Sequence, residues 1–315
     1  MSIVFDGNQY EIPGVRTVSF LDTVERKIGT KTRVQPAFGP AIHGKLRTEW
    51  IRGIVVHTNR GMEAGQIVPG GKDMGRDIAL ARYQASSTRV AGWDYTVDTD
   101  GSIAVSGDPF DMYTYHAGTV NSYTVGIEMV QDTNKPWNLY QDGIDSTVLL
   151  LDYLTARLGI QRQIMCWDST SNKFVTGVIP GRLQGPYDRK SKRNKPPTGG
   201  DVVGIYGHRN ITTNKGSGDP GNAIFDALRA AGYELMDVGK KQDIEIWKER
   251  QKALGLSPDL CNGVPGPETR RALALTGKSY GMWVSRPMDE LLRQQDTAAG
   301  FPDAHKNVFK IPGEK

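Results

Sequence analysis

Cysteine is nearly absent from this chain of 315 residues, which contains only Cys166 and Cys261. These two residues lie far apart in the sequence. They therefore make no closely spaced ligand pair of the kind that holds a metal ion, and a disulfide framework is not expected. We predict that both are reduced thiols buried in the interior, where free cysteine behaves as a small hydrophobic residue.

Long hydrophobic runs are also missing. The longest ones, such as residues 148–151, are far shorter than the roughly 20 apolar residues that a membrane-spanning helix requires. Residues 1–6 carry no basic stretch followed by an apolar core, so they do not form a Sec-type signal peptide. We expect a protein that is made in the cytoplasm, does not insert into a membrane and needs another route to any substrate outside.

Neither sign of charge is in large excess. Lys and Arg number 39 and Asp and Glu 35, which gives a net charge of +4 and a pI of about 8.9. With 38% hydrophobic and 23% charged residues, the chain is typical of a globular protein and not of a disordered one. Its mild basicity suits an acidic polymer. The sequence has no zinc finger, RNA-binding aromatic signature or long basic helix, so we expect no binding of nucleic acid.

Regular patterning begins at residue 51. Before it, residues 8–15 resemble a strand that enters a turn. Beyond it, β-branched runs and an Asp-Gly turn indicate strands, and hydrophobic spacings of three and four indicate helices. The predicted strands are 54–56, 93–97, 102–105, 125–130 and 202–206, and the predicted helices are 77–84 and 145–158. Because strands and helices are interleaved, we predict an α/β domain with a mixed central sheet layered with helices.

Two segments interrupt this pattern. Residues 161–200 have no clear periodicity and include a basic run at 189–195, which two prolines follow. This run is interpreted either as a solvated surface loop or as a basic clamp on an anionic polymer. A second change in composition at residues 237–241 indicates a linker.

Three potential metal ligands stand at the ends of predicted strands or in a tight turn. His57 and His208 each end a strand, and Asp219 lies in a Gly-Asp-Pro-Gly turn that would aim its carboxylate inward. Zinc in a hydrolase usually takes three protein ligands and leaves a fourth position open. A histidine at a strand end is often only structural, so from the residues alone both interpretations stay open.

Several short motifs occur between residues 51 and 232. They are IVVHT at 54–58, ARYQASS at 81–87, WDYTVDTDG at 93–101, YHAG at 115–118, NSYTVGIE at 121–128, GHR at 207–209 and GDPG at 218–221. In this order they resemble the zinc-dependent N-acetylmuramoyl-L-alanine amidases, a family that includes phage amidase endolysins and peptidoglycan recognition proteins. The resemblance implies the amidase and peptidoglycan-recognition fold, and bacterial peptidoglycan as the partner.

The resemblance also implies a chemistry. The family cuts the amide bond between N-acetylmuramic acid and L-alanine, and its Zn²⁺ ligands would be His57, His208 and Asp219. Bound zinc acidifies its water to a pKa of about 7 and polarises the scissile carbonyl. Glu128 would be the general base, as in relatives with Gly-Ile-Glu on this strand. The alternative role for Glu128 is that of a surface residue or a salt-bridge partner.

The sequence departs from the family pattern at two positions. Relatives often carry a lysine two residues before the third ligand, where this chain has Ser217. Lys215 could reach the same place through flexible glycines and stabilise the oxyanion. Trp93 stands where some relatives have a tyrosine, and it either stacks on a sugar ring or packs in the core. His116 matches the family's histidine before Ala-Gly, and it either contacts substrate in the cleft or is structural.

A second domain follows the predicted linker. Residues 244–256 (IEIWKERQKALGL) and 261–273 (CNGVPGPETRRAL) predict two helices separated by a glycine stop and an Asn-Gly turn. They resemble the small helical peptidoglycan-binding module, and the alternative is a generic helical hairpin. The expected organisation is an N-terminal extension of unknown role at 1–50, a zinc amidase domain at 51–236, an all-α binding domain at 240–295 and a tail at 296–315.

Two kinds of rival function are considered beside a wall hydrolase. One is a protein that recognises peptidoglycan without cutting it, although a complete ligand set is typical of the catalytic relatives. The other is a cytoplasmic amidase that recycles soluble muropeptides, which would gain nothing from a wall-binding module. With no signal peptide, a wall hydrolase is expected to be either a phage endolysin released through a holin lesion or an effector loaded into a secretion or injection machine.

Overall fold

The described part of the chain lies between residues 2 and 261 of the computed structural model. The described ranges are 2–5, 8–16, 18–20, 23–28, 31–36, 44–46, 51, 53–59, 67–86, 91–109, 112–158, 160, 162–179, 187–188, 193–194, 204–212, 215–238 and 244–261. The α-helices within them are α1 (Arg76–Ser86), α2 (Gln141–Leu158), α3 (Asn222–Ala230) and α4 (Ile244–Ala253). The 3₁₀ helices are η1 (Gly118–Tyr123), η2 (His208–Asn210) and η3 (Pro258–Leu260).

Nine of the described strands form one mixed sheet, in the order β15-β14-β18-β7-β12-β9-β10-β3, with β19 also paired to β14. These strands are β3 (Val18–Phe20), β7 (Gly53–Thr58), β9 (Tyr95–Val97), β10 (Ile103–Val105), β12 (Thr124–Met129), β14 (Gln163–Asp168), β15 (Lys173–Phe174), β18 (Gly204–Gly207) and β19 (Glu234–Asp237). The remaining described strands form two-stranded pairs. They are β1 (Ser2–Phe5), β2 (Asn8–Glu11), β4 (Thr23–Ile28), β5 (Lys31–Pro36), β6 (Gly44–Leu46), β8 (Ile67–Val68), β11 (Met112–Thr114), β13 (Leu139–Tyr140), β16 (Tyr187–Asp188) and β17 (Arg193–Asn194).

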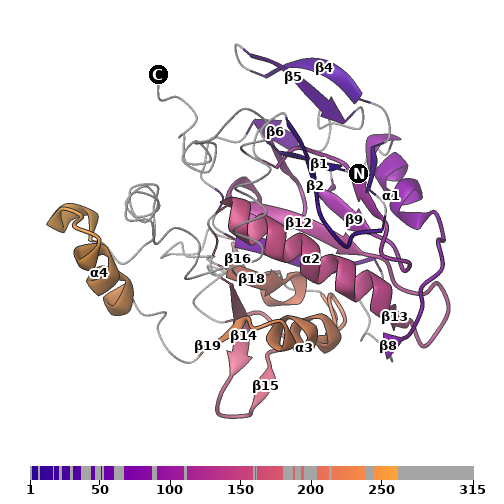
Figure 1. Cartoon of the computed structure of the whole chain (residues 1–315). Helices are drawn as coiled ribbons and strands as arrows, with labels where there is room; N and C mark the ends of the chain where they lie inside the picture. Colours follow the sequence, from indigo (N-terminus) through magenta and orange to yellow (C-terminus); the bar gives the residue numbers. More distant parts are fainter. Residues whose placement is uncertain are drawn as a thin grey trace.

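The middle of the sheet is parallel and buried. Strand β7 pairs in parallel with β12 on one side and with β18 on the other, and all of its residues are buried. Parallel strands covered on both faces are rich in β-branched residues, as the Ile54–Val56 run is. Helix α2 lies across the sheet in Figure 1, with α3 beside it, and buries most of its own residues. The predicted α/β class with a mixed sheet layered with helices is therefore confirmed.

The predicted local elements are found near their expected positions. Strand β9 pairs with β10 in an antiparallel hairpin, whose Gly101 adopts a positive φ of 84°. The predicted helices correspond to α1 and α2. Strand β14, in contrast, lies in the segment 161–200 where we found no periodicity. The basic run at 189–195 falls mostly outside the described residues, as does most of the linker. Residues 262–295 of the predicted binding domain and the tail at 296–315 also lie outside them.

The two cysteines behave as predicted. Both Cys166 and Cys261 are free thiols with buried side chains. Burial raises the pKa of the Cys166 thiol to about 12, so it stays protonated and unreactive at neutral pH. Cys166 therefore contributes to the hydrophobic core and offers no ligand or nucleophile.

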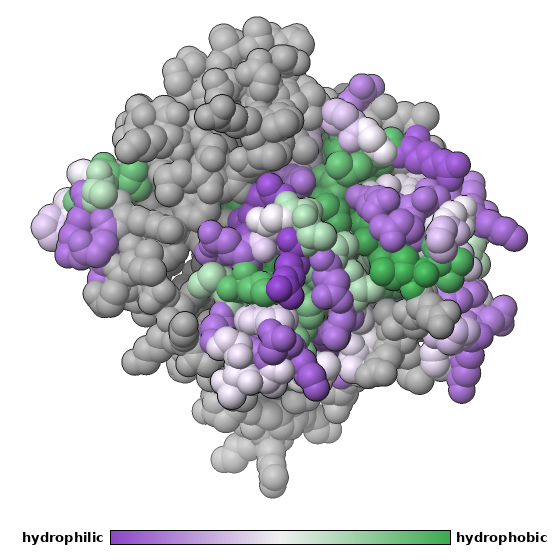
Figure 2. All heavy atoms as spheres, turned by 60° about the horizontal axis from the view of Figure 1, so that its bottom comes forward, coloured by the Kyte–Doolittle hydropathy of each residue, from purple (hydrophilic) through white to green (hydrophobic). Residues whose placement is uncertain are grey.

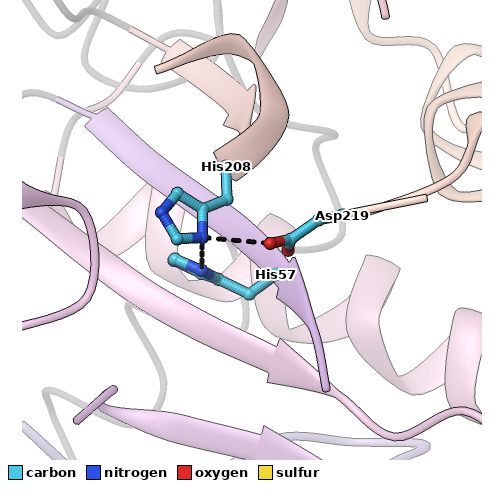
Figure 3. Close-up of side chains that lie close together, drawn as sticks. All are labelled: His57, His208 and Asp219. Carbon is cyan, nitrogen blue, oxygen red and sulfur yellow. Dashed lines mark hydrogen bonds and ion pairs between the residues drawn. The ribbon is translucent and has the colours of Figure 1, made fainter. Parts of the chain in front are cut away.

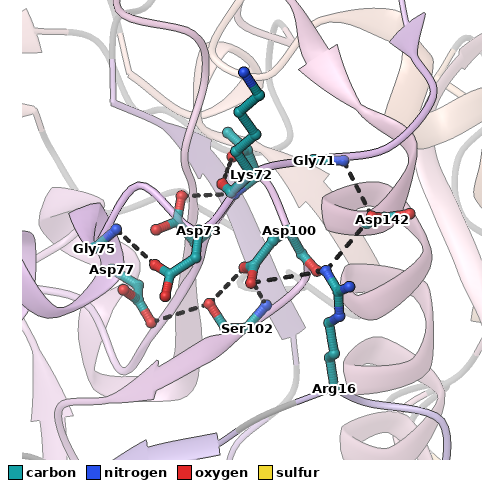
Figure 4. Close-up of polar contacts among 11 residues, drawn as sticks. Arg16, Gly71, Lys72, Asp73, Gly75, Asp77, Asp100, Ser102 and Asp142 are labelled. Atoms are coloured by element: carbon teal, nitrogen blue, oxygen red, sulfur yellow. Dashed lines mark hydrogen bonds and ion pairs between the residues drawn. The ribbon is translucent and has the colours of Figure 1, made fainter.

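The N-terminal segment is attached to the sheet domain. Strand β3 extends the sheet beside β10, and the side chain of Tyr10 is buried. The Arg157 guanidinium of α2 lies 4.0 Å from the centre of the Tyr10 ring, a cation–π contact. In Figure 4, Arg16 reaches the backbone carbonyl of Asp100 at 3.4 Å and the carboxylate of Asp142 on α2 at 3.9 Å. Part of the segment expected as a separate extension thus packs on the hairpin and on α2.

The described surface is mixed in character. Large exposed hydrophobic side chains among the described residues are Ile67, Met74 and Tyr83. The face in Figure 2 likewise intersperses hydrophobic with hydrophilic residues. Among the described residues no helix combines the length and the hydropathy needed to cross a bilayer.

Candidate metal centre

A row of polar side chains crosses the middle of the sheet. Thr96 of β9 is in register with Glu128 of β12, and Glu128 is in register with His57 of β7. Register partners on neighbouring parallel strands project from the same face, so these three side chains share one face. His208 continues the row, because it directly follows Gly207, the partner of Val56. Three strands and the first residue of η2 thus present polar groups along one line in the middle of the sheet.

Three members of this region form a tight cluster. The Nδ1 atoms of His57 and His208 are 2.8 Å apart, and His208 Nδ1 is 3.2 Å from Asp219 Oδ2 (Figure 3). One ligand atom from each residue lies within 4.8 Å of the others, and all three side chains are buried. The predicted trio is therefore brought together from two strand ends and a turn that are far apart in the sequence.

The donor set fits a zinc ion. Two nitrogen ligands at about 2.0–2.1 Å from a tetrahedral zinc would lie roughly 3.3 Å apart, close to the distances observed here. Burial, with the neighbouring His208 and His116, holds the pKa of His57 well below its usual value. Burial also lowers the pKa of His208, although its hydrogen bond to Asp219 opposes this shift. Both imidazoles are thus neutral at neutral pH, which is the form that binds metal.

Asp219 is held in place by the backbone around it. Burial is the largest single effect and would raise its pKa, but the hydrogen bond and charge of His208, the charge of Lys215 and the Thr58 backbone N–H together outweigh burial and leave the pKa below the usual value. Its Oδ1 accepts a hydrogen bond from the Thr58 backbone N–H at 2.9 Å. A side chain on Gly207 would lie 2.9 Å from Pro220 Cδ, so glycine allows the turn to approach the end of β18. The carboxylate is therefore ionised and oriented toward the histidines.

Arg209 anchors the loop that carries Asp219, and sequence reasoning missed it. Its backbone N–H donates to the Asp219 carbonyl at 2.8 Å. Its guanidinium donates to the Ser217 carbonyl and to Asn222 Oδ1, the latter at 2.7 Å. Its position next to His208 was the only available signal. A charged residue is seldom fully buried, so this role could not be expected from the residue type.

Glu128 lies beside the cluster with a perturbed carboxyl group. Burial, reinforced by the negative charge of Asp219, raises its pKa well above the usual value, and Lys215 partly opposes this effect. The side chain is 7% exposed, so water can still reach it. A carboxyl group with a raised pKa next to a metal-type cluster holds a proton more readily than an ordinary glutamate, which suits a group that accepts and then returns a proton.

The loop before Asp219 places a positively charged side chain next to the cluster. Lys215 Nζ lies 3.2 Å from Asp219 Oδ2. Ser217 instead offers its backbone carbonyl to Arg209. Lys215 is thus the cationic group next to the cluster, although it stands two residues earlier than in the family pattern.

The two predicted substrate-binding residues have different surroundings. His116 is buried behind His57, with its Nδ1 3.0 Å from His57 Nε2. Trp93 is half-buried, and its indole N–H donates to Thr96 Oγ1 at 2.5 Å. Trp93 thus borders the polar row at the β9 end, where stacking on a sugar stays a prediction. His116 contacts His57, and its contact with substrate likewise stays a prediction.

Known proteins provide an independent comparison. A family model described as N-acetylmuramoyl-L-alanine amidase matches residues 47–222, more than half of the chain. This span contains every site residue described above.

Several solved structures are also similar, and no curated protein matches. A mutant endolysin from Bacillus subtilis is 21% identical, with 39% of this chain and 73% of that chain covered and a TM-score of 0.30. The N-acetylmuramoyl-L-alanine amidase LysC from Clostridium intestinale URNW is 14% identical, with 69% and 97% covered and a TM-score of 0.33. Drosophila peptidoglycan recognition protein SD is 15% identical, with 64% and 90% covered and a TM-score of 0.34.

Proposed function

This chain belongs to the N-acetylmuramoyl-L-alanine amidase family, and from that premise we propose that it is a zinc-dependent hydrolase of bacterial peptidoglycan. The bond cut is the amide between the lactyl group of N-acetylmuramic acid and L-alanine. One observation carries the proposal: the buried His57, His208 and Asp219 cluster has Glu128 beside it on the same row. A protein that only recognises peptidoglycan would have no need of a proton acceptor next to a complete ligand set.

His57 and His208 through Nδ1, and Asp219 through Oδ2, would hold the zinc ion. When bound, zinc polarises the scissile carbonyl and makes a nearby water more acidic. Glu128 accepts a proton from the water that attacks the carbonyl carbon. It then returns this proton to the alanine nitrogen as the C–N bond breaks, which leaves a lactyl carboxylate and a free amine. Lys215 stabilises the negative charge that develops on the carbonyl oxygen.

The remaining parts of the chain support action on an insoluble polymer. We propose that residues 240–295 form a helical peptidoglycan-binding domain, of which α4 is the first helix. Tethering by such a domain raises the effective concentration of the catalytic site on the wall. The site of action would be the periplasm or the outside of the cell. Release through a holin lesion and delivery by an injection apparatus are two routes that suit such a protein.

Digestion of purified sacculi tests the proposed function. Zinc-loaded protein should release peptides that begin with a free L-alanine amine and leave glycan strands with unsubstituted lactyl carboxylates, both identified by mass spectrometry. Asp219→Asn, which removes a charged ligand and keeps its size, should give no such products. Zinc binding and sacculus binding without any cleavage would replace the hydrolase with a recognition protein. Products with new reducing ends would instead indicate a glycosidase.

A further inference from the structure

We infer that Thr124 and His116 form a hydrogen-bond relay that sets the tautomer of His57 and so aims its Nδ1 lone pair at the metal centre. This inference rests on the proposed zinc site and adds a positioning role for two residues outside the ligand set. The relay runs from Thr124 Oγ1 to His116 Nε2 at 3.2 Å, and from His116 Nδ1 to His57 Nε2 at 3.0 Å. All three side chains are buried.

The direction of the relay follows from the single hydroxyl proton of Thr124. Thr124 Oγ1 donates to the Val120 carbonyl at 2.7 Å, which is shorter than its 3.2 Å contact with His116. A hydroxyl has one proton and two lone pairs, so toward His116 it can act only as an acceptor. His116 therefore carries its proton on Nε2, and a neutral imidazole protonated there has an acceptor at Nδ1.

The contact between His116 and His57 determines which ring nitrogen of His57 carries the proton. Because His116 Nδ1 is an acceptor, His57 Nε2 must carry the proton that joins them. The Nδ1 atom of neutral His57 is then left with its lone pair, facing His208 Nδ1 at 2.8 Å. If the donors and acceptors of the relay were reversed, His57 would be protonated at Nδ1, and that proton would have to be displaced before a metal could bind there. Partners of this kind orient metal-bound histidines and typically affect metal affinity by about 10–100-fold.

The residues around His116 hold its ring in position for this contact. Asn121 Oδ1 accepts hydrogen bonds from the backbone N–H groups of His116 and Ala117, at 3.1 and 2.6 Å. A side chain on Gly126 would lie 2.7 Å from His116 Cγ, so glycine at this position lets the ring lie against β12. With both ring nitrogens engaged in the interior, His116 is oriented toward the ligand and not toward substrate. This differs from the cleft contact considered from the sequence.

Thr124→Val tests the relay, because it removes the hydroxyl while keeping the shape of the side chain. A matched control is available in α2, where Thr147 Oγ1 donates to the Gly143 carbonyl at 2.7 Å and is equally buried. Thr147→Val therefore loses the same kind of hydrogen bond away from the metal centre. Thr124→Ser restores the hydroxyl and serves as the conservative variant.

Two measurements are made on these proteins. Nitrogen-15 NMR of the metal-free wild type, with His57 assigned through His57→Ala, reports which ring nitrogen is protonated. Chelator competition gives the zinc dissociation constant of each variant, and thermal unfolding of the metal-free forms reports folding. We expect His57 to be protonated at Nε2, and Thr124→Val to weaken zinc binding about 10-fold, the lower end of the range for such partners. Thr147→Val should bind zinc like the wild type, and Thr124→Ser should lie within about 3-fold of it.

The outcomes separate the relay from the proposed function. His57 protonated at Nδ1 in the metal-free wild type would overturn the relay, whether or not zinc binds. Equal zinc affinity in Thr124→Val and Thr147→Val would also overturn it, as would a loss that Thr124→Ser fails to restore. A wild type that binds no zinc but has His57 protonated at Nε2 would refute the zinc site and leave the relay intact.

Discussion

Replacing Glu128 with glutamine separates a hydrolase from a recognition protein more sharply than any other single change. Glutamine keeps the size and shape of the side chain but cannot accept a proton. Because burial and Asp219 already raise the pKa of Glu128, the neutral amide removes an unfavourable charge from the site. We therefore expect the fold and the ligand cluster to survive the substitution.

The expected effect falls on turnover. A positioned general base contributes roughly 10²–10⁴-fold in rate. At about 1.36 kcal/mol for each factor of ten, this corresponds to about 2.7–5.4 kcal/mol of lost transition-state stabilisation. Glu128 is in register with the ligand His57 and is perturbed by the ligand Asp219, so the proton acceptor lies beside the proposed metal.

The assay follows release of L-alanyl peptides from sacculi, with zinc content and sacculus pelleting measured on the same samples. Glu11→Gln provides the same chemical change at an exposed position on β2 and should behave as the wild type. Glu128→Gln should lose turnover while keeping zinc and binding. Wild-type turnover in Glu128→Gln would refute its role as the base, and His116 or Lys215 would be examined next. Loss of zinc together with turnover would make Glu128 a structural residue.

Three further predictions concern the metal, the second domain and the fold. The wild type should hold about one zinc per molecule by elemental analysis, and His57→Ala and His208→Ala should each lose it; full occupancy in both variants would refute the ligand set. A chain that ends near Gly239 should still cleave soluble muropeptides but pellet less with sacculi, and unchanged pelleting would contradict the proposed binding domain. Burial raises the pKa of Asp77 from 3.8 to about 6, so the folded state holds this proton more tightly than the unfolded state does. The free energy of unfolding should therefore fall as pH rises from about 4 to 6, by about 1–3 kcal/mol after allowance for partial solvation and the favourable N-terminus of α1. Denaturant unfolding at several pH values should show a smaller fall in Asp77→Asn than in the wild type, and equal slopes in the two proteins would refute it.

The sequence was sufficient for the parts of the fold that local patterns determine. The β-branched run of β7 and the Asp-Gly turn before Gly101 carry their own structural preference, so strand and hairpin could be predicted from a few residues. Strand β14 could not, because Gln163–Asp168 mixes polar and apolar residues without alternation. It is a strand because β18 and β19 pair with it, and such tertiary context overrides weak local propensity.

The candidate site also has parts that local sequence marks and parts that depend on tertiary contacts. His57, His208 and Asp219 could be singled out as candidate ligands because a strand end or a tight turn marks each of them in the sequence, and the family resemblance favoured this interpretation over a structural one. The contact between His116 and His57 could not, since it joins residues 59 positions apart and depends on the space above Gly126. Burial of Arg209 could not be predicted either, because its partners lie in the loop that carries Asp219 and at the start of α3, and only the fold brings them together.

The electrostatics of the site favour a cation over any other occupant. Two carboxyl groups, Glu128 and Asp219, share a buried region, and each disfavours the charge of the other. In the metal-free protein this repulsion is relieved in part by Lys215, whose ammonium lies 3.2 Å from Asp219. A divalent ion bound by neutral imidazoles and one carboxylate would relieve it more fully, so metal binding at this site would be coupled to folding. The same arrangement that makes the cluster costly to bury would therefore favour the binding of a metal ion.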